Sequence, residues 1–433
     1  MDSSNTAGSE GRHEPPVGYL ELLRRNRDFR LLWLGQVVSQ LGDWFNTIAL
    51  YTLVLGITGG SGRAIGLVLV TRFLPVVFLG PFAGVVADRF NRRTVMIISD
   101  LARAFVVLGF LFIRRPEHLW MVYALSAVQL SLSTFFEPAR SAALPSVVSD
   151  RELMTANTIS SVTWSAMLTL GAAIGGLITS WFGTRAAFVL DSVSYLASAA
   201  LIASLRLPRR PPREKRKLTV SRALGLTDTL EGLRYVRTRP HVKALMLVKP
   251  AWGVGGGVLT LLTVFGDKIF TVGGRAASGI GILLAARGVG TAIGPLVTRR
   301  LAGETRGQMQ KGIGISFIIA GAFYAAFALS TNFPLALLLL AFAHIGGSML
   351  WVSSTVLLQT AVEDAFRGRV FAAEMMLLTL ALAASNYATG EALDRFRVSP
   401  RVITFAFGIF FMLPGVVWLL TGRWWDRETN EQG

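Results

Sequence analysis

The chain has 433 residues, 52% hydrophobic and 16% charged, and its 43 Lys and Arg against 26 Asp and Glu give a net charge of +17. It contains no cysteine, which excludes disulfides, iron–sulfur centres and thiolate zinc sites. The apolar residues come in blocks of about twenty, the length that spans a bilayer. This distribution disfavours a soluble enzyme.

The N-terminal segment is polar. Residues 1–28 are predicted to form a disordered cytoplasmic tail, because their first part is rich in Gly, Ser and Pro and lacks apolar runs. We find there no apolar region followed by a small-residue cleavage site, which a signal peptide would carry. The first span is therefore expected to begin near Phe29 and to remain in the mature protein.

Twelve apolar segments follow the tail. Gly, Ala and Ser recur within them, and such small residues allow helices to approach closely in lipid. We therefore predict an all-α integral membrane protein in which residues 29–205 and 243–421 form two pseudo-symmetric six-helix bundles. The predicted spans are 29–57, 63–87, 94–113, 118–139, 153–181, 185–205, 243–266, 276–298, 310–330, 333–361, 369–393 and 400–421.

The turn after the second predicted span sets the orientation. Residues 84–93 hold a carboxylate and three arginines between two apolar segments, and cationic hairpins stay in the cytoplasm. With this hairpin inside, 30 of the 43 Lys and Arg lie on the cytoplasmic side, 9 in outer loops and 4 within spans. We therefore expect a multi-pass protein of the cell (inner) membrane with both termini cytoplasmic, including a C-terminal tail of residues 422–433. The basic loops absorb the positive charge, so no nucleic-acid partner is expected.

The longest polar interruption, residues 206–242, divides the two bundles. Its first part combines Pro with a run of basic residues, which disfavours compact folding. An amphipathic helix is predicted over 224–235, with Leu226, Leu230 and Leu233 at helical spacing. This helix either lies on the anionic inner leaflet or serves as a solvated connector.

The two halves repeat one pattern. Gly66 precedes Arg72 by six residues, and Gly281 precedes Arg287 by the same distance. Each arginine is followed by Gly-Pro and then by a basic turn, at 92–93 in the first half and 299–300 in the second. A parallel repeat of two bundles is typical of many secondary transporters.

At this turn the chain resembles the major facilitator superfamily. The resemblance covers about residues 20–425, and Asn91 stands where the superfamily motif has Gly; Asn is the residue that next best tolerates a left-handed turn. The residues that match the motif are Gly84, Asp88, Arg89, Arg92 and Arg93.

Several shorter stretches are similar to the branch of enterobactin exporters and macrolide-efflux pumps: residues 28–32, 42–43, 136–140, 156–157 and 367–370. Residues 170–176 keep the glycines of an antiporter motif in the fifth helix but have Ala172 where Pro is expected. The resemblance implies the major facilitator fold and export by alternating access.

Ionisable residues inside spans are candidates for the substrate and coupling site, since each costs about 2.5–3.5 kcal/mol at the membrane centre. Asp43 lies about 14 residues into the first span, and Arg72 lies 16 residues before Asp88, so their depths are roughly 21 and 24 Å. A pair between them is feasible. Asp43 is then either a proton or cation acceptor influenced by Arg72, or half of a fixed ion pair.

Other intramembrane residues leave two interpretations each. Lys249 and Glu374 lie near the same depth and either pair or separately reach the interface. His344, near mid-membrane, is either a coupling group or a hydrogen-bonded packing residue. Arg287 is a further candidate, and span seven offers no matching acid for it. Asp191 has no obvious partner in the sequence. Four tryptophans inside spans, at 44, 164, 252 and 351, either line an aromatic cavity or pack between helices.

A second set of charges is predicted to form a cytoplasmic gate. We expect an ion-pair cluster that latches the halves when the cavity faces outward; the alternative is that these charges only set topology. The superfamily resemblance further implies that Asp88 contacts the start of span eleven, after Arg369, where a helix N-terminus favours a carboxylate. The cluster comprises Asp88, Arg92, Asp100, Arg103, Glu137 and Arg140, and the motif adds Gly84, Arg89 and Arg93.

These patterns predict a monomeric, proton-coupled exporter of a small amphiphilic molecule of drug, macrolide or siderophore type, in contact with membrane lipids. No cofactor or metal is expected, and no phosphate-binding Gly-Lys-Ser/Thr loop occurs. The alternatives are a lipid or lysophospholipid flippase or an importer on the same fold. A membrane enzyme is disfavoured by four scattered histidines, and a receptor or scaffold by the retained charges within spans.

Overall fold

The computed structural model describes residues 17–206, 226–301 and 305–430. Within these ranges regular structure is helical, apart from one isolated bridge between Val272 and Arg275. The first half contains α1 (Tyr19–Arg25), α2 (Arg27–Thr58), α3 (Gly62–Arg89), α4 (Arg92–Leu108), η1 (Gly109–Phe112), η2 (Pro116–His118), α5 (Leu119–Val147), α6 (Asp150–Ala166), the π-turn η3 (Met167–Gly171) and α7 (Ala172–Ala203).

The second half contains the linker helix α9 and the elements of the second bundle. They are α9 (Leu226–Arg237), α10 (Pro240–Val254), α11 (Val258–Lys268), α12 (Ala276–Leu301), α13 (Arg306–Leu329), α14 (Phe333–Ala361), α15 (Asp364–Asp394) and α16 (Pro400–Asn430). The last helix continues into the predicted C-terminal tail.

Ten helical segments among the described residues are long and apolar enough to cross a membrane. One of them, Asp150–Ala203, has 54 residues and turns at Gly183, whose φ of 82° is left-handed. At 1.5 Å per residue it is long enough to cross a bilayer core of about 30 Å twice. The 32-residue α2 is not among the ten, because charged and amide side chains lower its hydropathy. The predicted number of twelve spans stays a prediction.

The prediction of a disordered tail over residues 1–28 is wrong for its last part. Residues 19–25 form α1, and Leu22 is fully buried. Asn26 then caps α2 by accepting a hydrogen bond from the backbone N–H of Phe29 at 2.9 Å. Residues 1–16 lie outside the described part of the chain.

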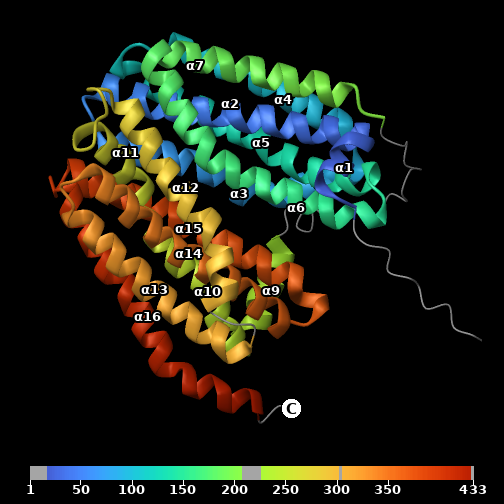
Figure 1. Cartoon of the computed structure of the whole chain (residues 1–433), viewed down its shortest axis with the longest axis vertical. Coiled ribbons are helices and arrows are strands. Elements are labelled where there is room, and N and C mark those ends of the chain that lie inside the picture. Colours follow the sequence, from blue (N-terminus) through green and yellow to red (C-terminus); the bar gives the residue numbers. More distant parts are fainter. Residues whose placement is uncertain (1–16, 207–225, 302–304, 431–433) are drawn as a thin grey trace, which may run out of the picture.

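The two groups of helices meet at one end and separate at the other (Figure 1). The open end carries α1, the turn at 90–91 and α9, and we call it the basic end. The opposite end, called here the far end, carries the turns at 59–61, 269–275 and 395–399. The groups touch along two seams, where α3 meets α15 and α7 meets α12.

Glycines make the α7–α12 seam possible. A Cβ on Gly176 would lie 2.8 Å from the carbonyl oxygen of Ala277, and one on Gly281 would lie 2.7 Å from that of Ala172. Only glycine fits between backbones this close. The Oγ atoms of Ser180 and Ser278 extend the seam with a hydrogen bond of 2.6 Å. Of the glycines in residues 170–176, Gly176 therefore serves contact between the bundles, whereas Gly171 and Gly175 lie against Trp44 of α2.

The linker helix α9 packs against α15, a contact that neither sequence interpretation included. Gly232 lies against the backbone of Arg369, where a Cβ would come within 2.6 Å of the carbonyl oxygen. Tyr235 is buried and stacks on Phe366 with ring centroids 4.4 Å apart. Glu231 forms an ion pair with Arg369 at 3.0 Å. This helix is thus part of the second bundle at the basic end.

Candidate functional site

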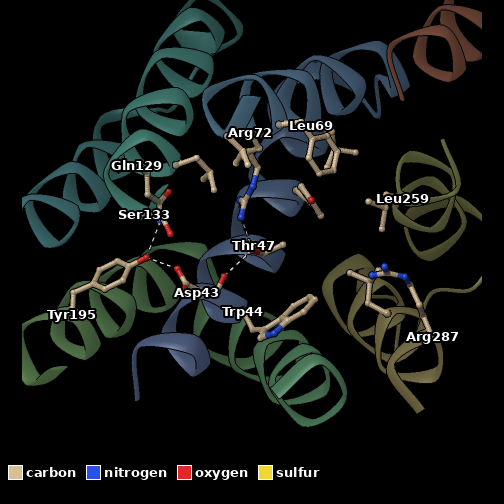
Figure 2. A pocket seen from close by; sticks show the side chains of 15 residues that line it. Asp43, Trp44, Thr47, Leu69, Arg72, Gln129, Ser133, Tyr195, Leu259 and Arg287 are labelled. Atoms are coloured by element: carbon tan, nitrogen blue, oxygen red, sulfur yellow. Dashed lines mark hydrogen bonds between the residues drawn. The ribbon is translucent and has the colours of Figure 1, made fainter. Parts of the chain in front are cut away.

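A central cavity of about 380 Å³ lies between the bundles. Helices α2, α3, α5 and α7 supply one side, and α11 and α12 supply the other (Figure 2). Its wall combines apolar and charged side chains. The lining residues are Asp43, Trp44, Thr47, Tyr51, Leu69, Arg72, Phe73, Val76, Gln129, Leu130, Ser133, Tyr195, Leu259, Leu284 and Arg287.

Asp43 is half-buried in this wall and is bound by a hydroxyl. Its Oδ1 accepts a hydrogen bond from the Tyr195 hydroxyl of α7. The Tyr195 oxygen in turn accepts from Nε2 of Gln129 at 3.2 Å, and Figure 2 shows the three side chains in a row. The charged and titratable groups around the carboxylate are Arg103, Tyr195, Arg72, Glu137 and Asp191.

Arg72 lies near Asp43, but it does not form an ion pair with it. Its Nη2 donates to Oγ1 of Thr47 at 3.2 Å, and Thr47 donates to the backbone carbonyl of Asp43 at 2.7 Å. Nη1 of Arg72 is buried without a hydrogen-bond partner among the described residues. Arg72 and Asp43 are therefore close to each other, as predicted, but Thr47 lies between them and they form no ion pair.

A second cavity, of about 560 Å³, adjoins the first toward the basic end. Asp43 and Ser133 line both cavities. The second cavity is largely polar and includes Arg103, Glu137 and Trp164 in its wall. Asp43 can thus be reached from the basic end through polar surroundings.

The sequence assigns Asp100 and Arg103 to the ion-pair cluster of the cytoplasmic gate, but the structure places them inside the first bundle and not between the two halves. Both are buried and form an ion pair with each other. Arg103 lies 11 residues into α4 from Arg92, so it is roughly 17 Å deep. Its guanidinium stacks over the ring of Tyr195 at 4.3 Å. The pair therefore belongs to the surroundings of Asp43.

Asp191 is the residue whose partner the sequence left unidentified. It is fully buried on α7, one turn before Tyr195, and its Oδ2 has no hydrogen-bond partner among the described residues. Its Oδ1 would lie 2.6 Å from a Cβ on Gly42, so it packs directly beside Asp43 on α2. Three carboxylates thus surround the single guanidinium of Arg103. Burial of uncompensated carboxylates is costly, and a bound proton removes one charge.

The remaining gate residues lie near the basic end, where the bundles are apart. Arg140 pairs with Glu137 and donates to Oε1 of Gln36 at 3.0 Å. Asp88 is exposed and forms no ion pair with a described residue, and a Cβ on Gly84 would meet nothing within 4 Å. No hydrogen bond or ion pair joins Asp88 to the described residues at the start of α15. That contact was predicted for the state with the cavity facing outward.

The turn at 90–93 is built differently from the prediction for Asn91. Its φ is −63°, and its side chain accepts hydrogen bonds from the backbone N–H groups of Arg93 and Thr94. It is therefore an N-cap residue, for which Asn is well suited. Arg92 donates to the carbonyl of Ala142 near the end of α5, and Arg93 to that of Ala203 at the end of α7. Cations stabilise helix C-termini, so these two arginines hold the first bundle together. Arg89 is exposed at the end of α3.

Lys249 and Glu374 do pair, which excludes the interpretation that each reaches the interface separately. The Lys249 Nζ lies 2.8 Å from Oε2 of Glu374, and both side chains are buried. The ammonium also lies 4.9 Å from the ring of Trp351. This pair is in the second bundle and does not line the central cavity.

Removing the carboxylate tests what this pair does. Glu374→Gln leaves a buried ammonium without its counter-charge, so we expect a loss of about 3–5 kcal/mol in unfolding free energy. Adding Lys249→Met restores most of it, and thermal unfolding in detergent measures both. Glu21→Gln, which breaks an exposed pair on α1, should cost less than about 1 kcal/mol. A Glu374→Gln chain as stable as the Glu21→Gln control would contradict a structural role.

His344 occupies a packed, hydrogen-bonded position. Its Nε2 lies 2.7 Å from the Tyr324 hydroxyl, and its ring meets that of Trp252 edge-on at 6.2 Å. It does not line the central cavity, which favours the packing interpretation. Of the tryptophans, Trp44 lines the central cavity, whereas Trp252 stacks on Phe411 at 4.8 Å.

The far end is held by a carboxylate that crosses between bundles. Asp394, the last residue of α15, accepts hydrogen bonds from the backbone N–H groups of Gly62 and Arg63, both at 3.0 Å, and from Oγ of Ser61. It therefore caps the N-terminus of α3, where a negative charge is favoured. The Arg63 side chain adds an ion pair with Glu391 at 2.8 Å.

Asp394→Asn should loosen this closure. Loss of charged hydrogen bonds at a helix N-terminus costs about 1.5–3 kcal/mol, which favours opening of the far end by roughly 10- to 150-fold. Because the chain lacks cysteine, spin labels on Glu117→Cys and Phe396→Cys can report the gap. We expect a longer distance in the variant. Asp364→Asn is the matched control, since Asp364 pairs with Arg367 of its own helix; an equal change in both would contradict the cap.

Comparison with known proteins decides the family. The family model for the Major Facilitator Superfamily matches residues 32–386. The chain belongs to this superfamily. It is therefore a multi-pass membrane transporter and not an enzyme, as predicted.

Relatives in the superfamily include exporters. The uncharacterized MFS-type transporter YfiS of Bacillus subtilis (strain 168) is 26% identical over 369 residues, 83% of this chain and 85% of YfiS. The putative bacilysin exporter BacE of the same organism is 29% identical over 229 residues, 52% of this chain and 56% of BacE. Macrolide efflux protein A of Streptococcus pyogenes is 26% identical over 222 residues, 51% of this chain and 54% of that protein.

Solved structures of other transporters share the fold. The nucleoside transporter NupG superposes with a TM-score of 0.69 at 14% identity, covering 91% of this chain and 98% of NupG. A bacterial homolog of the human lysosomal transporter Spinster, crystallised in an inward-facing and unoccupied conformation, gives 0.67 at 15% identity, covering 92% of this chain and 98% of that one. At these identities the likeness shows the fold alone.

Proposed function

We propose that this chain is a monomeric, proton-coupled exporter of a small amphiphilic molecule in the cell (inner) membrane, with the basic end and both termini in the cytoplasm. One observation carries the proposal. Asp43 stands where the central cavity meets the polar second cavity, and it is bound by Tyr195 and not by an arginine.

A hydroxyl partner suits a carboxylate that gains and loses a proton. Tyr195 donates to the ionised form, and its oxygen can accept from the protonated form. An adjacent ion pair with arginine would instead hold the carboxylate ionised. The unpaired Oδ2 of neighbouring Asp191 adds a further acceptor in the same cluster.

The movement that we propose is a rocking of the two bundles about the α3–α15 and α7–α12 seams. In this orientation the far end is closed outside the cell by the Asp394 cap and the Gly176–Gly281 contact, and the cavity opens toward the cytoplasm. Rocking of the bundles would break these contacts and bring Asp88 to the N-terminus of α15. Substrate taken up from the cytoplasm then leaves outside, and a proton that binds Asp43 outside is released inside. The similarity to the putative bacilysin exporter BacE and to macrolide efflux protein A supports this direction.

A groove between α3 and α5 favours one second candidate, a flippase for lipids or lysophospholipids. The groove has a volume of about 440 Å³ and shares Val76, Leu130 and Ser133 with the central cavity. An acyl chain could occupy this mostly apolar groove while a headgroup occupied the cavity.

The test is transport by the full chain in proteoliposomes, over a panel of siderophores, macrolides, dyes and fluorescent lysolipids, with and without an imposed pH gradient. Our proposal expects one class of compound to be concentrated only when a gradient is present, against proton flow. Movement that ignores the gradient would exclude proton antiport, and gradient-independent movement of lysolipids alone would favour the flippase.

A further inference from the structure

Two arginines at equivalent positions of the repeat face the central cavity from opposite bundles. Arg72 belongs to α3 and Arg287 to α12, and each follows the glycine of its repeat by six residues. Figure 2 shows both side chains directed to the same cavity, with Trp44 and Thr47 between them. The repeat thus places one cation on each moving half of the transporter.

Neither arginine forms an ion pair with a residue that the structure describes; the acid near Arg72 is Asp43, from which Thr47 separates it. Arg72 has one side-chain hydrogen bond, to Thr47, and a buried Nη1 without a partner in the described ranges. The Arg287 side chain makes no hydrogen bond or ion pair with any residue the structure describes, and its titratable neighbours are Tyr51, Tyr324 and His344, none of which carries a negative charge at neutral pH. An arginine without a counter-charge in a membrane-spanning helix is costly, so a functional partner is expected.

Across the cavity, Asp43 presents the opposite charge. Its Oδ1 is bound by Tyr195, whereas no hydrogen bond reaches its Oδ2 from the described residues. A cation bound there would compete with a proton for the same carboxylate. Such competition is what exchange of substrate for a proton requires. The lining therefore offers one anionic site and two cationic sites, separated by Thr47 and Trp44.

We propose that the substrate is a zwitterionic amphiphile, whose amine binds Asp43 while its carboxylate or phosphate bridges Arg72 and Arg287. This inference rests on the proposed function, because it takes the central cavity as the substrate site. The apolar part of the molecule packs against Trp44, Phe73 and Leu284, which line the same cavity. Guanidinium groups suit this role, since they bind carboxylates and phosphates through paired hydrogen bonds.

Matched probes on the purified full chain in uncharged detergent test the proposal. The first set is the dipeptide phenylalanyl-phenylalanine, its N-acetyl form without the amine and its C-terminal amide without the carboxylate. The second set is lysophosphatidylethanolamine and lysophosphatidylglycerol, of which only the former carries an amine. Binding is measured by thermal shift and by Trp fluorescence. Tighter binding of the dipeptide set would indicate an amino-acid-like substrate, and tighter binding of the second set would indicate a lipid.

We expect the zwitterion of the preferred set to bind at least about tenfold more tightly than its singly charged relatives. Arg72→Gln and Arg287→Gln should each weaken the zwitterion and the N-acetyl anion by about 10- to 100-fold and leave the amide unchanged. Asp43→Asn should weaken the zwitterion and the amide but not the anion. Arg185→Gln, at an exposed site on α7, should change none of them.

The proposal is overturned if neither zwitterion exceeds its singly charged relatives, or if both arginine variants bind the anion as wild type does. It would also fall if the Asp43→Asn chain lost the anion and the amide equally. These results leave the proposed function separately testable, because gradient-driven transport of a compound without an anionic group would sustain the exporter and exclude the zwitterion.

Discussion

Replacing Asp43 with Asn should abolish the response of transport to a pH gradient while leaving the fold intact. Asn keeps the size of the side chain and its hydrogen bond with Tyr195, but it cannot exchange a proton. With one proton exchanged per substrate and a gradient of one pH unit, wild type can concentrate substrate up to about tenfold. The Asp43→Asn chain should only equilibrate it, as measured by accumulation in proteoliposomes.

Exchange without a gradient provides the control for this variant. Counterflow of labelled against unlabelled substrate needs the cavity and the rocking motion but no net proton movement, so Asp43→Asn should retain it at substrate concentrations high enough to offset the weaker binding inferred above. Asp364→Asn, an exposed acid on α15, should keep both activities. Accumulation by Asp43→Asn equal to that of wild type would refute the role assigned to Asp43.

The second large effect is expected from Gly281→Ala at the α7–α12 seam. The added Cβ would lie 2.7 Å from the carbonyl oxygen of Ala172 in the closed far end. Overpacking of this kind costs about 1–3 kcal/mol, which lowers the ratio of closed to open far end by roughly 5- to 150-fold. Spin labels on Arg185→Cys and Arg275→Cys, on either side of the seam, should report a wider gap, and transport should fall with it.

Gly56→Ala is the matched substitution, since a Cβ at Gly56 on α2 meets nothing within 4 Å. Alanine favours helix over glycine at both positions, so helix propensity alone would stabilise both variants. The two variants therefore differ only in the steric contact of the added Cβ. If the gap at the far end were the same in the Gly281→Ala and Gly56→Ala chains, close backbone contact at the seam would not control closure of the far end.

The depth of Asp43 and Arg72 followed from the sequence because rise per residue in a helix is fixed. Their partners did not, because rotation of neighbouring helices about their axes decides which side chains meet. The sequence therefore did not predict that Thr47 and Tyr195 bind Asp43. Spacing held a usable signal, since Asp43 and Thr47, and likewise Asp191 and Tyr195, are four residues apart and share a helix face.

The error over Asp100 and Arg103 had a different cause. Asp100 and Arg103 are near Asp88 in sequence, which suggests one cluster, although the rise per residue of a helix places Arg103 well inside the membrane. The contact of Asp88 with α15 illustrates a further limit. A transporter adopts two conformations with one sequence. A motif whose residues make a contact in one conformation can lack that contact in the other.

The most direct test of the account measures the gaps at both ends in one experiment. Distances between spin labels on Met154→Cys and Gly307→Cys report the basic end, and those on Glu117→Cys and Phe396→Cys report the far end. With Asp43 present, a change of pH should shift the two distance distributions in opposite directions, and Asp43→Asn should remove that shift. Distances that move together, or a pH response that survives in Asp43→Asn, would contradict alternating access controlled by a proton at Asp43.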